Sequence, residues 1–255
     1  MKIRVLGGFG SEQPCCGLTG FLINEGVVLD AGTISTALTI PEQAKITHVI
    51  LSHAHLDHTK ALPFMLDNIA GKAPGPVEIM AAAEVIETLH AHIFNNQVWP
   101  DFSRIPSTRK PVIRFRKLVP GREVLAAGLR IKPVRVNHTV PTTGFIISDD
   151  GCAIVYSGDT KATEDIWKAA SKLGPGLKAL FVETSFPNRM QELADRSGHL
   201  TPRSLGVELK KVKSYDGPVF VYHVKSQYLV DIERELDALG RKDIIVVRDE
   251  MEWEI

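Results

Sequence analysis

The residues of this chain best suited to chemistry lie in the run 52–59, which reads SHAHLDHT. Three imidazoles and a carboxylate fall within six positions, at His53, His55, Asp57 and His58. Imidazole nitrogen and carboxylate oxygen are ligands that borderline cations such as zinc accept. Two histidines on one helix face need a separation of three or four residues, so this spacing predicts a loop that wraps around a metal. The alternative, a polar surface loop, requires four good ligand types to cluster by accident.

Three further residues of ligand type follow strand-like runs. His138 comes after the run 129–136, Asp159 after 152–156 and His223 after 218–222. Proteins that alternate strands and helices build their sites on loops at the C-terminal ends of strands. Any one of these residues alone would be an ordinary polar loop residue, but the ordered set favours a metal site.

The stretch His53-Ala-His55-Leu-Asp57-His58 resembles the HxHxDH signature of the metallo-β-lactamase superfamily, whose members also carry a lone His, an Asp and a final His in this order. The resemblance implies an αββα sandwich of two mixed β-sheets flanked by helices, which binds two divalent metals. It assigns His53, His55 and His138 to one metal, Asp57, His58 and His223 to the other, and Asp159 to a bridge between them. Zinc is the metal we expect first, and manganese and iron also accept this ligand mix.

A Glu and a His outside the ligand set form a second group. In the phosphodiesterase branch of the superfamily, exemplified by ribonuclease Z, a dyad of these types lies beside the metals. By resemblance, His199 would protonate the departing oxygen while Glu183 orients it and keeps it charged. The resemblance also counts Asp57 among the catalytic residues. A capped loop histidine and a surface glutamate are the alternative interpretation.

Three stretches resemble class II cyclic-nucleotide phosphodiesterases more narrowly: LDAGT at 29–33, DHTKALPF at 57–64 and IFNNQVWPDF at 93–102. This resemblance extends from about Gly7 to Lys225. It implies hydrolysis of 3′,5′-cyclic AMP or GMP, a small-molecule substrate, to the 5′-monophosphate by attack of a metal-bridging hydroxide. The alternatives are a ribonuclease Z-like tRNA 3′-processing endonuclease, a lactonase or thioesterase, and a non-catalytic scaffold.

Substrate contacts are predicted in the last of these stretches. Asn95 and Asn96 can donate and accept hydrogen bonds against a base edge, and Trp99 or Phe102 can stack on the base. Equally, the two aromatic rings can anchor a loop in the core. Lys225, two residues after His223, is either a phosphate contact or a solvated cation.

Composition limits the partners. Lys+Arg and Asp+Glu both number 30, so the formal net charge is zero and a nucleic-acid partner is not expected. A basic segment keeps the ribonuclease alternative open; it comprises Arg104, Arg109, Lys110, Arg114, Arg116 and Lys117.

The general class of the chain follows from its length and composition. With 255 residues, 44% of them apolar and 24% charged, it resembles a soluble globular protein of one domain spanning 1–255. The absence of a signal-peptide pattern and of a run of about 18 apolar residues predicts a cytoplasmic protein without membrane contact. Three cysteines do not make a disulfide framework and are expected to be small buried side chains. A homodimer is the default expectation for a soluble enzyme.

The elements that must position these residues alternate between strands and helices, which predicts an α/β sandwich. Helices are expected over 81–94, after the N-caps Thr163 and Thr201, and over 229–239. Strands are expected at 3–6, 20–23, 27–29, 46–51, 112–118, 129–136, 144–148, 152–156, 179–182, 219–222 and 244–247.

Overall fold

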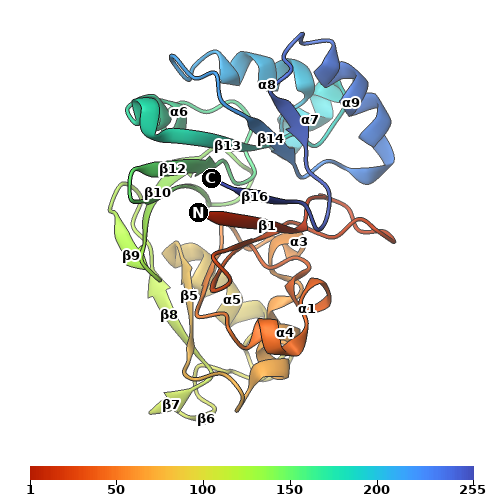
Figure 1. Ribbon diagram of the computed structural model, residues 1–255. Coiled ribbons are helices and arrows are strands. Elements are labelled where there is room, and N and C mark those ends of the chain that lie inside the picture. The colour runs from red at the N-terminus through yellow and green to blue at the C-terminus, as the bar shows by residue number, and fades with distance from the viewer.

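Short runs rich in β-branched and aromatic residues form two seven-stranded sheets in the computed structural model, which describes residues 1–255. Figure 1 shows the two sheets stacked, with helices on the outer face of each. A separate two-stranded ribbon pairs β6 (Pro106–Ser107) with β7 (Lys110–Pro111). The predicted αββα sandwich of two mixed sheets is therefore confirmed.

The first sheet has the strand order β16-β1-β2-β3-β4-β5-β8. Its first three pairings are antiparallel, whereas β3, β4, β5 and β8 are parallel to one another. Parallel neighbours need crossover connections, and helices supply them here. The strands are β1 (Lys2–Gly7), β2 (Gly20–Ile23), β3 (Val27–Leu29), β4 (His48–Ile50), β5 (Val77–Ala81), β8 (Ile113–Lys117) and β16 (Glu252–Glu254).

The second sheet has the order β15-β14-β13-β12-β11-β10-β9. Strands β9 to β12 form an antiparallel meander, and β12 to β15 are parallel. Its strands are β9 (Val124–Ala126), β10 (Leu129–Val136), β11 (Thr142–Asp149), β12 (Cys152–Tyr156), β13 (Leu177–Glu183), β14 (Val219–Tyr222) and β15 (Ile244–Val246).

Helices cover both outer faces, so the protein has three apolar layers. One lies between the sheets, one beneath α1, α4 and α5, and one beneath α6, α8 and α9. None of the helices has the length and apolarity needed to cross a membrane. The helices are α1 (Ile34–Ala37), α2 (Ile40–Gln43), α3 (Leu56–Thr59), α4 (Leu62–Ile69), α5 (Ala83–His92), α6 (Asp165–Ser171), α7 (Gln191–Ser197), α8 (Pro202–Leu209), α9 (Leu229–Asp237) and the short 3-10 turns η1 (Gly174–Gly176), η2 (Asn188–Met190) and η3 (Ser226–Tyr228).

Most predicted elements are present, and three details differ. The metal motif is not wholly a loop, because α3 carries its second half. Helix α6 begins one residue later than expected, after Glu164, and its predicted cap Thr163 is buried and donates its N–H to Glu208. The cysteines are unpaired as expected, but the prediction that they are buried is wrong, since Cys15 is exposed. The cap at Thr201 is confirmed as a capping box.

The buried carboxylate of Glu208 ties α6 to α8. It accepts hydrogen bonds from the Thr163 N–H at 3.0 Å and the Trp167 indole at 2.7 Å, and pairs with Lys211 at 2.8 Å. Glu208→Ala is expected to reduce the free energy of unfolding by about 2–4 kcal/mol, because two buried donors and one cation lose their acceptor. Urea unfolding would measure this loss. The exposed Glu164, which also pairs with Lys211, provides the control, and Glu164→Ala should leave the free energy of unfolding almost unchanged.

Candidate metal centre

The ligand-type residues meet because their strands end at the same edges of the two sheets. In the second sheet β11 runs antiparallel to both β10 and β12, so β10, β12, β13 and β14 all point the same way. His138, Asp159 and His223 follow the C-terminal ends of β10, β12 and β14, and Glu183 is the last residue of β13. The HxHxDH motif follows the C-terminal end of β4 in the facing sheet. The two edges therefore close on one point.

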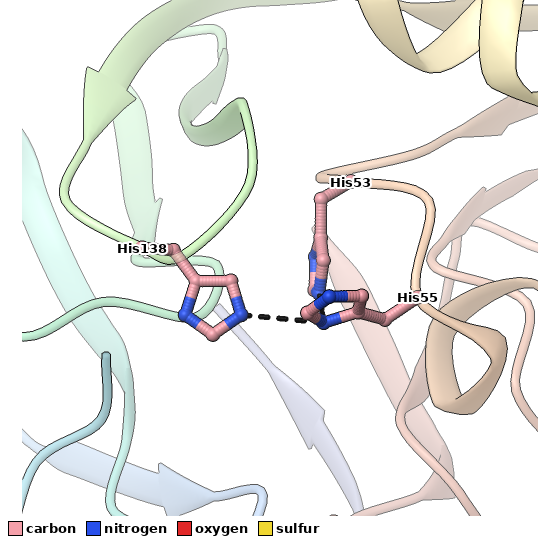
Figure 2. A group of neighbouring side chains, drawn as sticks. All are labelled: His53, His55 and His138. Atoms are coloured by element: carbon pink, nitrogen blue, oxygen red, sulfur yellow. Dashed lines mark hydrogen bonds between the residues drawn. The ribbon is translucent and has the colours of Figure 1, made fainter. Parts of the chain in front are cut away.

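Three imidazoles form the first group, and Figure 2 shows them converging from the loop after β4 and the loop after β10. Nδ1 of His55 lies 3.0 Å from Nε2 of His53 and 3.3 Å from Nε2 of His138. Ligands about 2.0–2.1 Å from a tetrahedral zinc ion lie about 3.3 Å from one another. The group therefore has the spacing of three ligands around one cation.

The second group comprises Asp57, His58 and His223, whose ligand atoms lie within 4.8 Å of one another. Asp159 connects the two groups. Its Oδ2 is 3.2 Å from Nε2 of His223, 3.3 Å from Nε2 of His58 and 3.7 Å from Nε2 of His53. The structure thus brings together all seven residues that the sequence assigned to metals, with Asp159 between the groups.

Hydrogen bonds fix the tautomers of two of these histidines. Nδ1 of His58 lies 2.8 Å from the carboxylate of Asp30, and Nδ1 of His138 lies 2.9 Å from the carbonyl of Gly198. Since neither acceptor has a proton to donate, Nδ1 carries the hydrogen and Nε2 presents a lone pair to the centre. Gly198 itself has φ of 79° at the C-cap of α7, and a Cβ there would lie 2.7 Å from the His138 ring, so glycine is required.

Hydroxyl groups fix the tautomers of two further histidines, His53 and His223. The hydroxyl of Ser52 donates to Asp30 at 2.7 Å, so its oxygen accepts from Nδ1 of His53 at 3.0 Å. In the same way, the hydroxyl of Thr19 donates to the carbonyl of Phe9 and accepts from Nδ1 of His223 at 2.8 Å. Nε2 of His53 and His223 therefore also points a lone pair inward.

The ligand atoms at the centre of the two groups are hydrogen-bond acceptors that no donor faces. Nε2 of His58, Nε2 of His223 and Oδ1 of Asp159 are all buried and have no hydrogen-bond partner. Buried polar atoms are rarely left unpaired, because each costs about 1–3 kcal/mol. Cations between the two groups would satisfy all three atoms. The residues present therefore fit a pair of divalent metal ions, and a nitrogen and oxygen donor set suits zinc, manganese or iron.

The electrostatics of the centre agree with this fit. Burial lowers the pKa of His53 and His223 well below the ordinary value. Burial also opposes protonation of His58, but the carboxylates of Asp159 and Asp30 outweigh it and raise the pKa of His58, so a cation at Nε2 would replace a proton that these carboxylates otherwise favour. Burial would raise the pKa of Asp159, yet His223 and His58 hold it well below its usual range. Asp159 is thus ionised and attracts positive charge.

Glu183 and His199 form the predicted dyad at the rim of this centre. Nδ1 of His199 lies 2.9 Å from Oε1 of Glu183, and a second contact of 4.0 Å joins it to Oδ2 of Asp159. Glu183 is fully buried and also accepts from the Thr160 N–H and the Ser185 hydroxyl. Burial opposes protonation of His199, but the Glu183 carboxylate outweighs it and raises the pKa of His199. This arrangement holds a proton beside the metal groups.

The four residues predicted to contact a base have contacts within their own loop or with the neighbouring helix α4. The side chain of Asn95 caps the N–H groups of Gln97 and Val98, and Asn96 accepts from the Asp101 N–H. Phe102 is buried, and Trp99 packs on Phe64 with ring centroids 5.1 Å apart. These contacts favour a role as loop anchors, the second of the two interpretations of this stretch.

Lys225 extends towards the second metal group. Its ammonium group lies 4.0 Å from Oδ2 of Asp57 and donates to the carbonyl of Gly10. Gly10 is itself close to the site, since a Cβ there would lie 2.7 Å from the His223 ring. Lys225 is therefore a half-buried cation beside the second ligand group.

Sequence reasoning missed the acceptors that hold the histidines, above all Asp30. This carboxylate is buried, has φ of 54°, and also accepts from the Ser52 N–H and the Tyr156 hydroxyl. Left-handed backbone at a non-glycine residue is strained and concentrates at functional sites. The only sequence signal was its place in the LDAGT stretch, directly after the apolar strand β3.

Asp30→Asn is expected to weaken divalent-metal binding about 10–100-fold, because the neutral amide no longer fixes the tautomer of His58. Isothermal titration with zinc on metal-stripped protein measures the change. The exposed Asp67→Asn serves as the control, and equal zinc affinity in the two variants would contradict the role of Asp30.

Comparison with known proteins identifies the family of this chain. The model of the beta-lactamase superfamily domain matches residues 27–215. A probable 3′,5′-cyclic-nucleotide phosphodiesterase of Yersinia pestis is 30% identical over 208 residues, which cover 72% of this chain and 58% of that protein. The chain thus spans little more than half the length of this curated relative.

Solved structures show the same fold. Unliganded yeast PDE1 superposes with a TM-score of 0.81 at 19% identity over 97% of both chains. The short form of human tRNase Z superposes with a TM-score of 0.73 at 17% identity, covering 100% of this chain and 99% of that one. The superfamily expected from the HxHxDH motif is confirmed: this chain belongs to the beta-lactamase superfamily.

Proposed function

We propose that this protein is a metal-dependent phosphodiesterase that hydrolyses 3′,5′-cyclic nucleotides to 5′-monophosphates. The observation that carries the proposal is the Glu183–His199 dyad, which holds a proton beside two groups of metal-ligand side chains. The similarity to the Yersinia pestis protein, named as a probable enzyme of this kind, supports the choice of substrate.

The seven ligand side chains would hold two divalent ions, which supply a nucleophile from water at neutral pH and stabilise charge on phosphoryl oxygens. We assign His53, His55 and His138 to one ion and Asp57, His58 and His223 to the other, with Asp159 shared. Zinc is our first choice of metal. Lys225 lies on the same side as Asp57 and would contact a phosphate oxygen.

The dyad acts on the leaving group. As the bond between phosphorus and the 3′-oxygen breaks, the oxygen takes up the proton that His199 carries. Glu183 accepts from Nδ1 of His199, so it orients the ring and stabilises the imidazolium before the transfer. An alkoxide is a poor leaving group and needs a proton donor, whereas the thiolate of a thioester leaves without one, so this acid has a clear role on a phosphodiester and none on a thioester.

The ribonuclease alternative requires a cationic surface for the RNA backbone near the metals. In the basic segment, Arg104 and Arg116 are paired with Asp101 and Glu78. Of the unpaired cations of that segment, Arg109, Lys110 and Arg114 precede or begin β8, at the opposite edge of the sheet from the metal groups, and only Lys117 lies at the C-terminal end of β8. This arrangement favours a small substrate over tRNA.

Turnover of metal-loaded protein tests the proposal, with cyclic AMP, cyclic GMP, 2′,3′-cyclic AMP and a precursor tRNA compared in parallel. Release of 5′-AMP or 5′-GMP at rates well above those for the other two substrates is the expected result. Cleavage of the precursor tRNA alone would contradict the proposal and indicate a ribonuclease Z-like endonuclease. A homodimer, a cytoplasmic location and one domain over 1–255 stay predictions from the sequence.

A further inference from the structure

A pocket lies away from the metal-ligand groups, where the loop between α4 and β5 faces the ribbon β6–β7. Its volume is about 510 Å³. Three cations line it, Arg109, Lys110 and Arg114, and no acidic side chain does. Its remaining walls are apolar or small; they include Ile69, Pro74, Pro76, Pro106, Pro111 and Val112.

These three cations lack carboxylate partners. No Asp or Glu oxygen lies within 4.0 Å of Arg109, Lys110 or Arg114, although the flanking Arg104 and Arg116 each have one. The chain carries equal numbers of acidic and basic residues, so a concentration of three unpaired cations is a local feature of this pocket. Such a group repels itself and attracts an anion.

The pocket and the metal centre lie at opposite edges of the first sheet. Strands β4, β5 and β8 are parallel, and the metal motif follows the C-terminal end of β4. The pocket residues 71–76 precede β5, and 106–112 precede β8. A five-residue strand is about 16 Å long. Figure 1 shows β6 and β7 at the foot of the molecule, away from α3.

We propose that this pocket binds a nucleoside phosphate at a site separate from the metal centre. Guanidinium and ammonium groups would hold its phosphates by charge-assisted hydrogen bonds, and the proline walls would cover the base and ribose. The volume falls within the usual range for small-molecule sites, about 300–1,000 Å³, and the mixture of cations with apolar walls matches a ligand that is anionic at one end.

The test is isothermal titration of ADP into metal-stripped protein with EDTA present. Asp159→Asn should bind ADP as the wild type does, because the metal centre is not used. Arg109→Ala and Arg114→Ala should each weaken ADP binding about tenfold, and the triple variant with Lys110→Ala should abolish it. Lys117→Ala removes an unpaired cation at the other end of β8 and should have no effect. Thermal melting checks that each variant is folded.

Three further probes identify the ligand chemistry. Pyrophosphate should bind more weakly than ADP, because it lacks the base and ribose. Adenosine should bind more weakly than pyrophosphate, because it lacks the phosphates. Raised salt concentration should weaken the binding of ADP. Equal ADP binding in the triple variant, or its loss in Asp159→Asn, would overturn the proposal. So would pocket-dependent binding of a single-stranded RNA without binding of ADP, which would identify a nucleic-acid surface instead.

Discussion

Asp159→Asn is expected to lower the metal content below the two ions per chain that we propose for the wild type, and to reduce kcat roughly 10³-fold or more. Oδ2 of Asp159 lies within 3.7 Å of histidine nitrogens from both ligand groups, so one substitution weakens both metal positions. Loss of a metal removes several kcal/mol of transition-state stabilisation. Metal analysis of the purified variant and its turnover of cyclic AMP measure the two effects.

The exposed Asp150→Asn is the matched control and should keep full metal content and activity. Two ions bound tightly to Asp159→Asn would contradict the assignment of this residue as a shared ligand. Normal turnover with reduced metal content would show instead that only one ion is needed for the reaction.

His199→Ala is expected to lower kcat about 10²–10⁴-fold while the metal content stays unchanged. In the proposed reaction the proton of His199 goes only to the leaving oxygen, so the expected loss depends on the substrate. A nitrophenyl phosphodiester, whose phenolate leaves without protonation, should lose far less activity than cyclic AMP. Parallel assays of the two substrates with wild type and variant measure this difference.

Glu183→Gln should show the same dependence on substrate with a smaller loss, because the amide still positions His199 but no longer stabilises its charge. An equal loss on both substrates would argue against a general acid. A loss of metal from His199→Ala would identify the residue as a ligand, a role its proximity to His138 and Asp159 also allows geometrically. The two variants therefore separate proton transfer from metal binding.

The sequence predicted which ligand-type residues come together and most of the strands. His53, His55, Asp57 and His58 are adjacent along the chain, so covalent geometry alone keeps them together. The other ligands could be predicted because each follows an apolar run, and these runs form the strands β10, β12 and β14. These three strands, and β2 and β3, have the predicted bounds. The single turn α3 was missed because its four residues are too few for a helical period to appear.

The features that the sequence did not predict depend on contacts between residues far apart in the chain. The acceptors Asp30, Thr19 and Gly198 hold histidines that are 28, 204 and 60 positions away, and no local pattern encodes such pairs. The 93–102 stretch suggested a base contact because its residue types suit one, whereas in the fold the side-chain oxygens of Asn95 and Asn96 already accept hydrogen bonds within the loop.

The sequence by itself determined which residues could bind metals and which strands would carry them, because ligand type and apolar period are local properties. Only the tertiary structure decided the tautomer of each histidine, the meeting of Glu183 with His199, and the separation of the basic pocket from the metal centre. These depend on strand order and direction, since the sheet edge at which a strand ends is set by its neighbours.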